Sequence, residues 1–208
     1  MPSIPELLQT SAARHDHLCP RQVLGVRMGL AGLAILDLEP PVTKSKALVI
    51  VETDGCFVDG IEVATGVTVG HRSLRIVDLG KIAATFVGIA AGKAVRLVPR
   101  DGIRALAHTY APEAAERYAA QLQGYAAMPS DELFMAQDVI LHPPLAEILS
   151  RPDARAACSR CGEEIINERE VVQDGTLLCR TCAGAGYYTD PDFLVDRAVT
   201  RASPNTRS

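Results

Sequence analysis

The sequence ALVIVETDGCFVDG at residues 47–60 contains the pattern that decides the fold of the chain. Its first five residues are apolar and mostly β-branched, and an uninterrupted run of this kind is typical of a strand buried on both faces. The spacing of the apolar residues that follow predicts a short helix over residues 57–65, with Gly66 where a C-cap glycine is favoured. We therefore predict a buried strand that leads directly into a helix, with Cys56 at their connection.

Helices are predicted before this strand, and further strands and helices after it. Pro20 suits the first turn of a long apolar helix, and the pair Pro40-Pro41 ends that helix. Short β-branched runs with Gly-Lys turns between them predict strands, and Ser130 is a favoured N-cap residue. The predicted helices cover residues 4–14, 20–38, 112–125 and 130–137, and the predicted strands cover residues 74–77, 83–89 and 94–98. The fold class that follows is α+β, with helices packed on a mixed β-sheet.

Composition and charge exclude several function classes. The chain has 208 residues, 48% of them hydrophobic, which is enough for one domain with a real core and a small appendage. A formal net charge of -4 and an aromatic content of 4% do not favour binding to nucleic acid. The longest apolar stretch, residues 26–38, is short and contains Arg27 and Asp37, so no membrane span is predicted. Residues 1–6 lack the basic start and apolar run of a secretory signal, which predicts a cytoplasmic protein whose cysteines are thiols or metal ligands.

Two Cys-x-x-Cys pairs near the C-terminus predict a zinc site. Cys158 and Cys161 form the first pair, Cys179 and Cys182 form the second, and seventeen residues separate the pairs. This spacing is typical of four-cysteine zinc sites, and a hairpin turn predicted at residues 173–175 would bring the pairs together. Four thiolates fill the coordination sphere of a tetrahedral ion, so the predicted zinc is structural rather than catalytic. We expect a small treble-clef-like module, with a zinc ribbon as the alternative.

A second group of metal-binding or nucleophilic residues lies nearer the N-terminus. His15, His17 and Cys19 occur at alternate positions, and the histidines of an extended segment with this spacing point to one side. Cys19 precedes a predicted helix, whose dipole favours a thiolate there. Together with Cys56, these residues predict a core site that is either catalytic or metal-binding. In the second case the core would hold a metal ion in addition to the zinc of the finger.

Each of these residues also has a simpler structural interpretation. A buried Cys56 on its own is most often a small core hydrophobe. Histidines that precede a helix are often surface residues. Glu52 and Asp59 would orient a histidine or act as proton carriers, with exposed salt bridges as the simpler interpretation. His71 is a weaker candidate.

The predicted organisation is an α+β core over residues 1–150, a zinc-finger module over 151–190, and a flexible tail over 191–208.

Several short motifs occur in a fixed order along the chain. They are residues 15–20 with Gly25, residues 55–59, 65–70, 78–83 and 130–134, and the two Cys-x-x-Cys pairs. In order and spacing, this series resembles the FmdE family of formylmethanofuran dehydrogenase subunits over residues 5–188. One position departs from the family pattern, because Val67 stands where a cysteine is usual.

The resemblance implies an α+β core with a C-terminal treble-clef finger, paired as a homodimer. It also implies a metal-linked accessory protein or an uncharacterised enzyme, with His17, Cys19 and Cys56 in the core site. A metal ion or small molecule would bind at this core site, and the protein would serve one-carbon or molybdenum/tungsten enzyme metabolism. A rival interpretation is a binding module whose finger docks a protein or nucleic-acid partner while the core dimerises. A third is metal storage or delivery, and whether the protein is an enzyme stays open.

Overall fold

The apolar run at residues 47–51 forms β1 (Ala47–Val51), an inner strand of a five-stranded sheet. The computed structural model describes residues 2–15 and 17–188, so the tail predicted over residues 191–208 lies outside the described part. The sheet order is β2-β1-β3-β4-β5, and only the pair β1–β2 is parallel. The other strands are β2 (Leu74–Ile76), β3 (Ala84–Gly88), β4 (Lys93–Pro99) and β5 (Phe134–Asp138). The prediction of a mixed sheet is confirmed.

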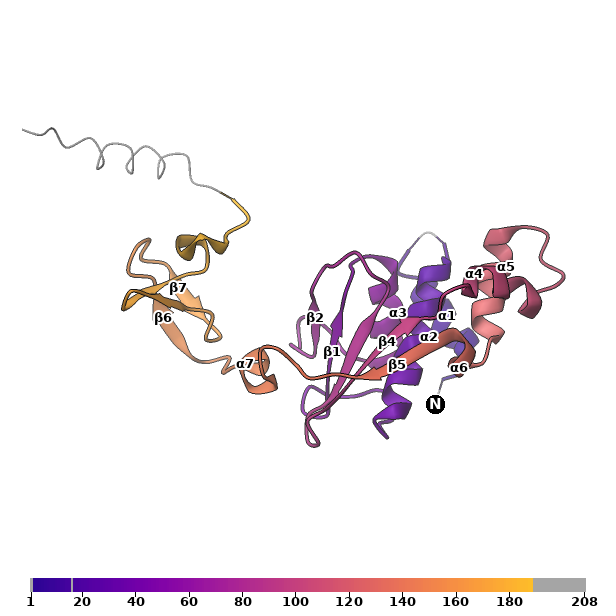
Figure 1. Ribbon diagram of the computed structural model, residues 1–208, viewed down its shortest axis with the longest axis horizontal. Helices are drawn as coiled ribbons and strands as arrows, with labels where there is room; N and C mark the ends of the chain where they lie inside the picture. The colour runs from indigo at the N-terminus through magenta and orange to yellow at the C-terminus, as the bar shows by residue number, and fades with distance from the viewer. Residues whose placement is uncertain (1, 16, 189–208) are drawn as a thin grey trace, which may run out of the picture. The chain divides into compact units, whose positions relative to one another are not determined.

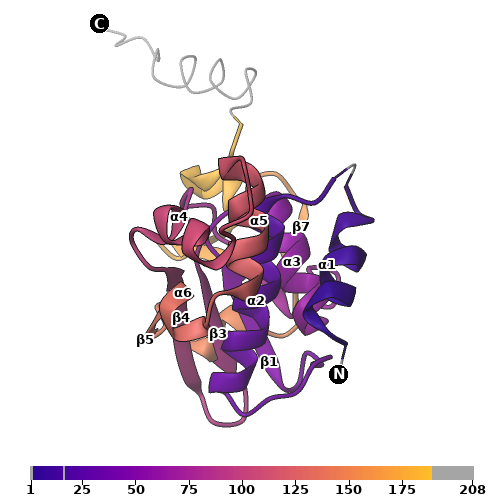
Figure 2. The same ribbon diagram turned by 90° about the vertical axis from the view of Figure 1, so that its right-hand side faces the viewer.

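Helices form a layer on one face of this sheet (Figures 1 and 2). The helix α2 (Pro20–Ile35) lies in the middle of the layer, with α1 (Ile4–Ala12), α3 (Cys56–Thr65) and α5 (Arg117–Ala127) around it. Val49 and Phe86 of the sheet and Met28 of α2 are fully buried in one apolar cluster between the layers. The remaining short elements of this unit are α4 (Ile103–Leu106), the 3-10 helix η1 (Ala107–Tyr110) and α6 (Ser130–Leu133).

The helices α2 and α3 cross at two glycines. A Cβ atom added to Gly25 would lie 2.2 Å from the carbonyl oxygen of Phe57, and one added to Gly60 would lie 2.4 Å from that of Gln22. Any side chain at either position would therefore force the two backbones apart. Because the crossing lies in the first half of each helix, it brings their N-terminal ends close together.

A buried arginine joins α2 to the end of α5. Arg27 is only 7% exposed, and its guanidinium donates to the carbonyl oxygens of Tyr125, Ala126 and Met128 at 3.0, 2.5 and 2.6 Å. These groups lie at the C-terminal end of α5, where a positive charge is favoured by the helix dipole. The contacts fix α5 against the central helix.

Three predicted helices differ from the observed ones by three residues or more at one end. The helix predicted over residues 130–137 stops at Leu133, and the residues after it form β5, an edge strand that pairs with β4. Phe134 is only 4% exposed in the core, so pairing and burial outweigh the local helical preference. The helix predicted from residue 112 begins at Arg117, and α2 ends at Ile35 rather than at residue 38.

The chain divides into two compact units, Met1–Leu145 and Ala146–Ser208. The second unit contains two short hairpins followed by a helical turn, η2 (Thr181–Ala185). Asp174 and Gly175 both have positive φ, at 49° and 75°, as the predicted tight turn of the second hairpin requires. The elements before η2 are α7 (Leu145–Leu149), β6 (Arg155–Ala157), β7 (Glu164–Ile166), β8 (Val171–Gln173) and β9 (Thr176–Leu178). Among the described residues, no helix combines the length and the apolar character that a membrane crossing needs.

Candidate functional site

The four finger cysteines converge on one point in the second unit. The sulfur atoms of Cys158, Cys161, Cys179 and Cys182 all lie within 4.8 Å of one another. A tetrahedral zinc ion with Zn–S bonds of about 2.3 Å needs sulfur atoms about 3.8 Å apart, and those of Cys161 and Cys179 are 3.9 Å apart. The donor type, number and spacing therefore fit a zinc ion.

Backbone N–H groups donate hydrogen bonds to sulfur atoms of this cluster and so stabilise the thiolate form of these cysteines. The amide of Cys179 donates to the sulfur of Cys158 at 3.2 Å, and that of Cys182 donates to the sulfur of Cys179 at 3.3 Å. Hydrogen bonds from the Cys161 and Cys179 amides lower the pKa of Cys158 to about 6. Burial and the neighbouring cysteines raise the pKa of Cys182 to about 12. Four thiolates at this spacing require a cation among them, and bound zinc would cross-link the two hairpins of the module.

The two core cysteines lie at the paired helix ends of the first unit. Cys19 is the N-cap of α2, and Cys56 is the first residue of α3. Both are partly buried free thiols. Burial raises the pKa of Cys56, and an interaction with the Cys19 side chain raises it further. The structure therefore brings together two predicted residues that are far apart in the sequence.

His15 contacts α3 rather than the two thiols. Its Nε2 lies 2.5 Å from Oδ2 of Asp59, and Asp59 is also 3.6 Å from Arg14. Arg14 in turn pairs with Glu62 at 2.6 Å. Asp59 thus orients the His15 ring beside the start of α3 and also lies within ion-pair distance of Arg14, so it takes part in both a histidine contact and a salt bridge, two of the roles predicted for this carboxylate.

The other candidates are arranged differently. His17 is exposed, and within residues 2–15 and 17–188 no core group of three or more possible ligands has the compactness of the finger cluster. Glu52 accepts two hydrogen bonds from Arg96 at 2.5 and 2.7 Å, and His71 is bonded to the Thr68 hydroxyl at 2.9 Å. Val67 is fully buried in the main core. The candidate core site is thereby reduced to Cys19 and Cys56, with the His15–Asp59 pair at the same end of α3.

Tyr118 is a site residue that the sequence did not indicate. Its hydroxyl donates to the carbonyl oxygen of Leu18 at 3.0 Å. This bond holds the ring next to the residue that precedes Cys19. Burial raises the pKa of Tyr118, with further contributions from Cys19 and Cys56. In the sequence, Tyr118 lies in an alanine-rich helix about a hundred positions after Leu18, and no motif distinguishes it. Only the packing of α5 on α2 brings it close to Cys19.

Two family models match separate parts of the chain. Residues 14–135 match the family described as FmdE, molybdenum formylmethanofuran dehydrogenase operon. Residues 152–188 match the prokaryotic dksA/traR C4-type zinc finger.

Two individual proteins are similar to most of the chain. A curated Archaeoglobus fulgidus protein named "Probable S-adenosyl-L-methionine-binding protein" is 31% identical over 209 aligned positions, which cover 88% of this chain. The alignment covers 54% of that relative, so the chain spans about half of the relative's length. The crystal structure of an FmdE-like protein of the tungsten formylmethanofuran dehydrogenase type, from Syntrophus aciditrophicus, has a TM-score of 0.56 at 19% identity. The structural match covers 89% of this chain and 95% of the chain in that crystal structure, and it shows the fold alone.

Proposed function

Since the chain belongs to the FmdE family through residues 14–135, we propose that its core site binds a soft metal ion or a small metabolite at Cys19 and Cys56. The site would serve one-carbon or molybdenum/tungsten enzyme metabolism. The observation that carries this proposal is the thiol pair itself. Two partly buried thiols lie at the N-terminal ends of two helices, α2 and α3, that cross in backbone contact at Gly25 and Gly60.

The surroundings of the pair suit a soft cation or an electrophilic group. Thiolates are preferred ligands of soft metals and are good nucleophiles. Two nearby thiolates repel each other, so a cation that binds between them would relieve this cost. His15 is held close by through Asp59, and His17 lies two residues before Cys19 in the same segment. These imidazoles would supply further ligands or carry a proton.

The test compares paired cysteine variants of the full chain. Cys19→Ser with Cys56→Ser is expected to keep one zinc per chain, held by the finger, and to lose binding of added Cu(I) or Cd(II) at a second site. The matched control, Cys179→Ser with Cys182→Ser, should lose the finger zinc and keep the second site. Metal content is measured by plasma mass spectrometry after gel filtration. Unchanged metal binding and unchanged metabolite binding in the Cys19/Cys56 variant would refute the proposal.

A second candidate function is binding of S-adenosyl-L-methionine by the core. The support is the name of the Archaeoglobus relative, which aligns with 88% of this chain. Equilibrium dialysis with labelled S-adenosyl-L-methionine, with methionine as the control ligand, tests it. Retention of both compounds at the same low level would remove this candidate.

The rival function, partner docking by the finger, has less support. Arginines give the module its basic character, but two of them are paired with carboxylates, Arg151 with Glu168 and Arg155 with Glu164. Two others donate to backbone carbonyl oxygens, Arg160 to that of Cys182 and Arg169 to those of Glu147 and Ile148. The two ion pairs reduce the positive charge that the module offers to the phosphates of a nucleic acid. We retain the homodimer as a proposal, which sedimentation equilibrium of the full chain tests.

A further inference from the structure

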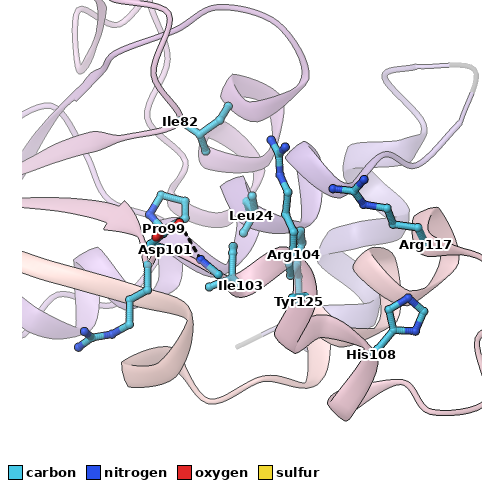
Figure 3. Close-up of a pocket in the computed structure, with 12 residues that line it drawn as sticks. Leu24, Ile82, Pro99, Asp101, Ile103, Arg104, His108, Arg117 and Tyr125 are labelled. Carbon is cyan, nitrogen blue, oxygen red and sulfur yellow. Dashed lines mark hydrogen bonds between the residues drawn. The ribbon is translucent and has the colours of Figure 1, made fainter.

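The first unit contains a cavity that none of the candidate site residues lines. It has a volume of about 670 Å³, which falls in the range of small-molecule sites. Its wall comes from the end of β4, the turn after it and α4, from η1 and α5, and from single residues of α2 and the loop before β3 (Figure 3). The lining residues are Leu24, Ile82, Pro99, Arg100, Asp101, Gly102, Ile103, Arg104, Ala105, His108, Arg117 and Tyr125.

Positive charge from separate elements meets at this cavity. Arg100 follows β4, Arg104 belongs to α4, and Arg117 is the first residue of α5. Within the described part of the chain, no salt bridge involves any of these three arginines. In Figure 3 the side chains of Arg104 and Arg117 extend on the same side of the cavity. Their charges remain available for a ligand.

The acidic and neutral polar groups of the wall do not balance this charge. Asp101 is the one carboxylate among the lining residues, and its Oδ1 accepts a hydrogen bond from the Gly102 amide at 2.9 Å. Arg100 donates from Nε to the Asp131 carbonyl at 2.7 Å, which orients its side chain without neutralising it. His108 adds a further nitrogen donor or acceptor to the wall. The cavity is therefore cationic overall.

The apolar part of the wall is held firmly in place. Leu24, Ile103 and Tyr125 are 7%, 6% and 2% exposed, so their positions are set by the core. A Cβ atom added to Gly124 would lie 2.4 Å from the Ala107 carbonyl oxygen, which shows that α5 and η1 are in backbone contact. With Arg27 bound to the end of α5, the cavity is formed before any ligand arrives. A preformed site avoids the entropic cost of ordering on binding.

We propose that this cavity binds a small organic anion, with its carboxylate or phosphate group at Arg104 and Arg117 and its apolar part against Leu24, Ile103 and Tyr125. Guanidinium groups match the planar oxygens of such anions and bind them through paired hydrogen bonds. The site is additional to the Cys19–Cys56 pair and does not depend on the function proposed for that pair. A ligand with a net positive charge, such as one carrying a sulfonium and an ammonium group, is disfavoured here by the same arginines.

The test uses inorganic pyrophosphate as the probe and the full-length chain. In two-dimensional amide spectra of the ¹⁵N-labelled protein, pyrophosphate should cause saturable shifts at Gly102, Ile103 and Ala105. Arg104→Gln with Arg117→Gln should weaken this binding by at least about tenfold. Lys44→Gln with Lys46→Gln removes the same charge from an exposed loop outside the cavity lining and should leave the affinity within about twofold of wild type.

Two further measurements make the assignment specific. Arg104→Lys with Arg117→Lys keeps the charge but removes the guanidinium fork, so binding is expected to be intermediate. Anilinonaphthalene sulfonate, which joins an anionic group to an apolar body, should bind the wild type more tightly than pyrophosphate and be displaced by it. Equal losses in the Arg→Gln and Lys→Gln pairs, or saturable shifts confined to other regions, would overturn the proposal. Both arginines are exposed, so their replacement should not unfold the chain. The thermal unfolding temperature of each variant is measured first and should match that of the wild type.

Discussion

The finger and the core of this protein both contain cysteines that meet in space, but they bring them together in different ways. In the finger, two short Cys-x-x-Cys motifs and one tight hairpin place four sulfur atoms within 4.8 Å of one another. In the core, Cys19 and Cys56 meet only because two glycines let α2 and α3 cross in backbone contact. The finger site therefore depends on local sequence and a metal ion, and the core site depends on long-range packing.

Removing the metal is the strongest way to test this difference. Cys179→Ser, or chelation of the wild type, should unfold the finger, since apparent zinc-binding energies of about 10–16 kcal/mol are folding energy in such modules. Amide signals of residues 155–185 should collapse to random-coil positions while the core signals stay in place. Ser159→Ala serves as the control between two ligands and should leave the zinc bound. Loss of core signals on chelation would contradict the separation drawn above.

Overpacking the helix crossing should damage the core and spare the finger. Gly25→Ala would place a methyl group against the Phe57 carbonyl oxygen, where an added Cβ lies at 2.2 Å. We expect a loss of about 3 kcal/mol of unfolding free energy or more, measured by urea denaturation. The finger should keep its zinc.

Gly70→Ala is the matched control for this change. A Cβ atom at Gly70 would have no other atom within 4 Å, so its effect should be within about 0.5 kcal/mol. An equal loss in both variants would mean that the crossing is not the cause.

The ion pair between Glu52 and Arg96 provides a smaller, pH-dependent test of the core. The Arg96 hydrogen bonds hold the pKa of Glu52 below its ordinary value, against the effect of burial. A carboxyl with a lowered pKa stabilises the folded state above its unfolded pKa and loses this contribution as the pH falls through the folded pKa. Glu52→Gln should therefore cost about 2 kcal/mol at neutral pH.

The difference between Glu52→Gln and wild type should shrink in acid, as followed by thermal unfolding between neutral and acid pH. Glu62→Gln is the control, because Glu62 pairs with the exposed Arg14 and should change stability by less than about 1 kcal/mol. A Glu52→Gln effect that stays constant down to low pH would argue against the ion pair as its source.

The smallest expected effect concerns thiol reactivity, which tests whether Cys19 and Cys56 of the core influence each other. Burial is the first cause of the raised pKa of Cys56 and the Cys19 side chain is the second. Cys19→Ser should lower the pKa of Cys56 and speed its alkylation by iodoacetamide a few-fold at neutral pH. Mass spectrometry of the zinc-loaded protein measures this rate at Cys56. An unchanged rate would indicate that the two thiols act independently.

The sequence predicted what short-range patterns determine. The β-branched run forms β1 with the predicted bounds, and Gly66 ends α3 with φ at 80° as a C-cap should. The finger was also predictable, because its ligands and its turn lie within 25 residues of one another.

What the sequence could not predict depends on partners distant along the chain. Residues 134–138 carry a helical local pattern and become a strand only because β4 offers an unpaired edge. The packing of α5 on α2 brings Tyr118 close to Cys19 and brings Arg117 to the cavity, where it meets Arg100 and Arg104 from the segment after β4. No spacing rule in a single sequence reports such contacts.

The bonds of Arg27 have a consequence for how this unit is expected to open and close. They connect α2 to groups about a hundred residues later in the chain, so we expect this long loop to close late in folding. We also expect α5 and the cavity it lines to open together as one cooperative segment. Native-state hydrogen exchange would show α5 and η1 exchanging at one common rate, and an anion held in the cavity would slow that rate for the whole segment.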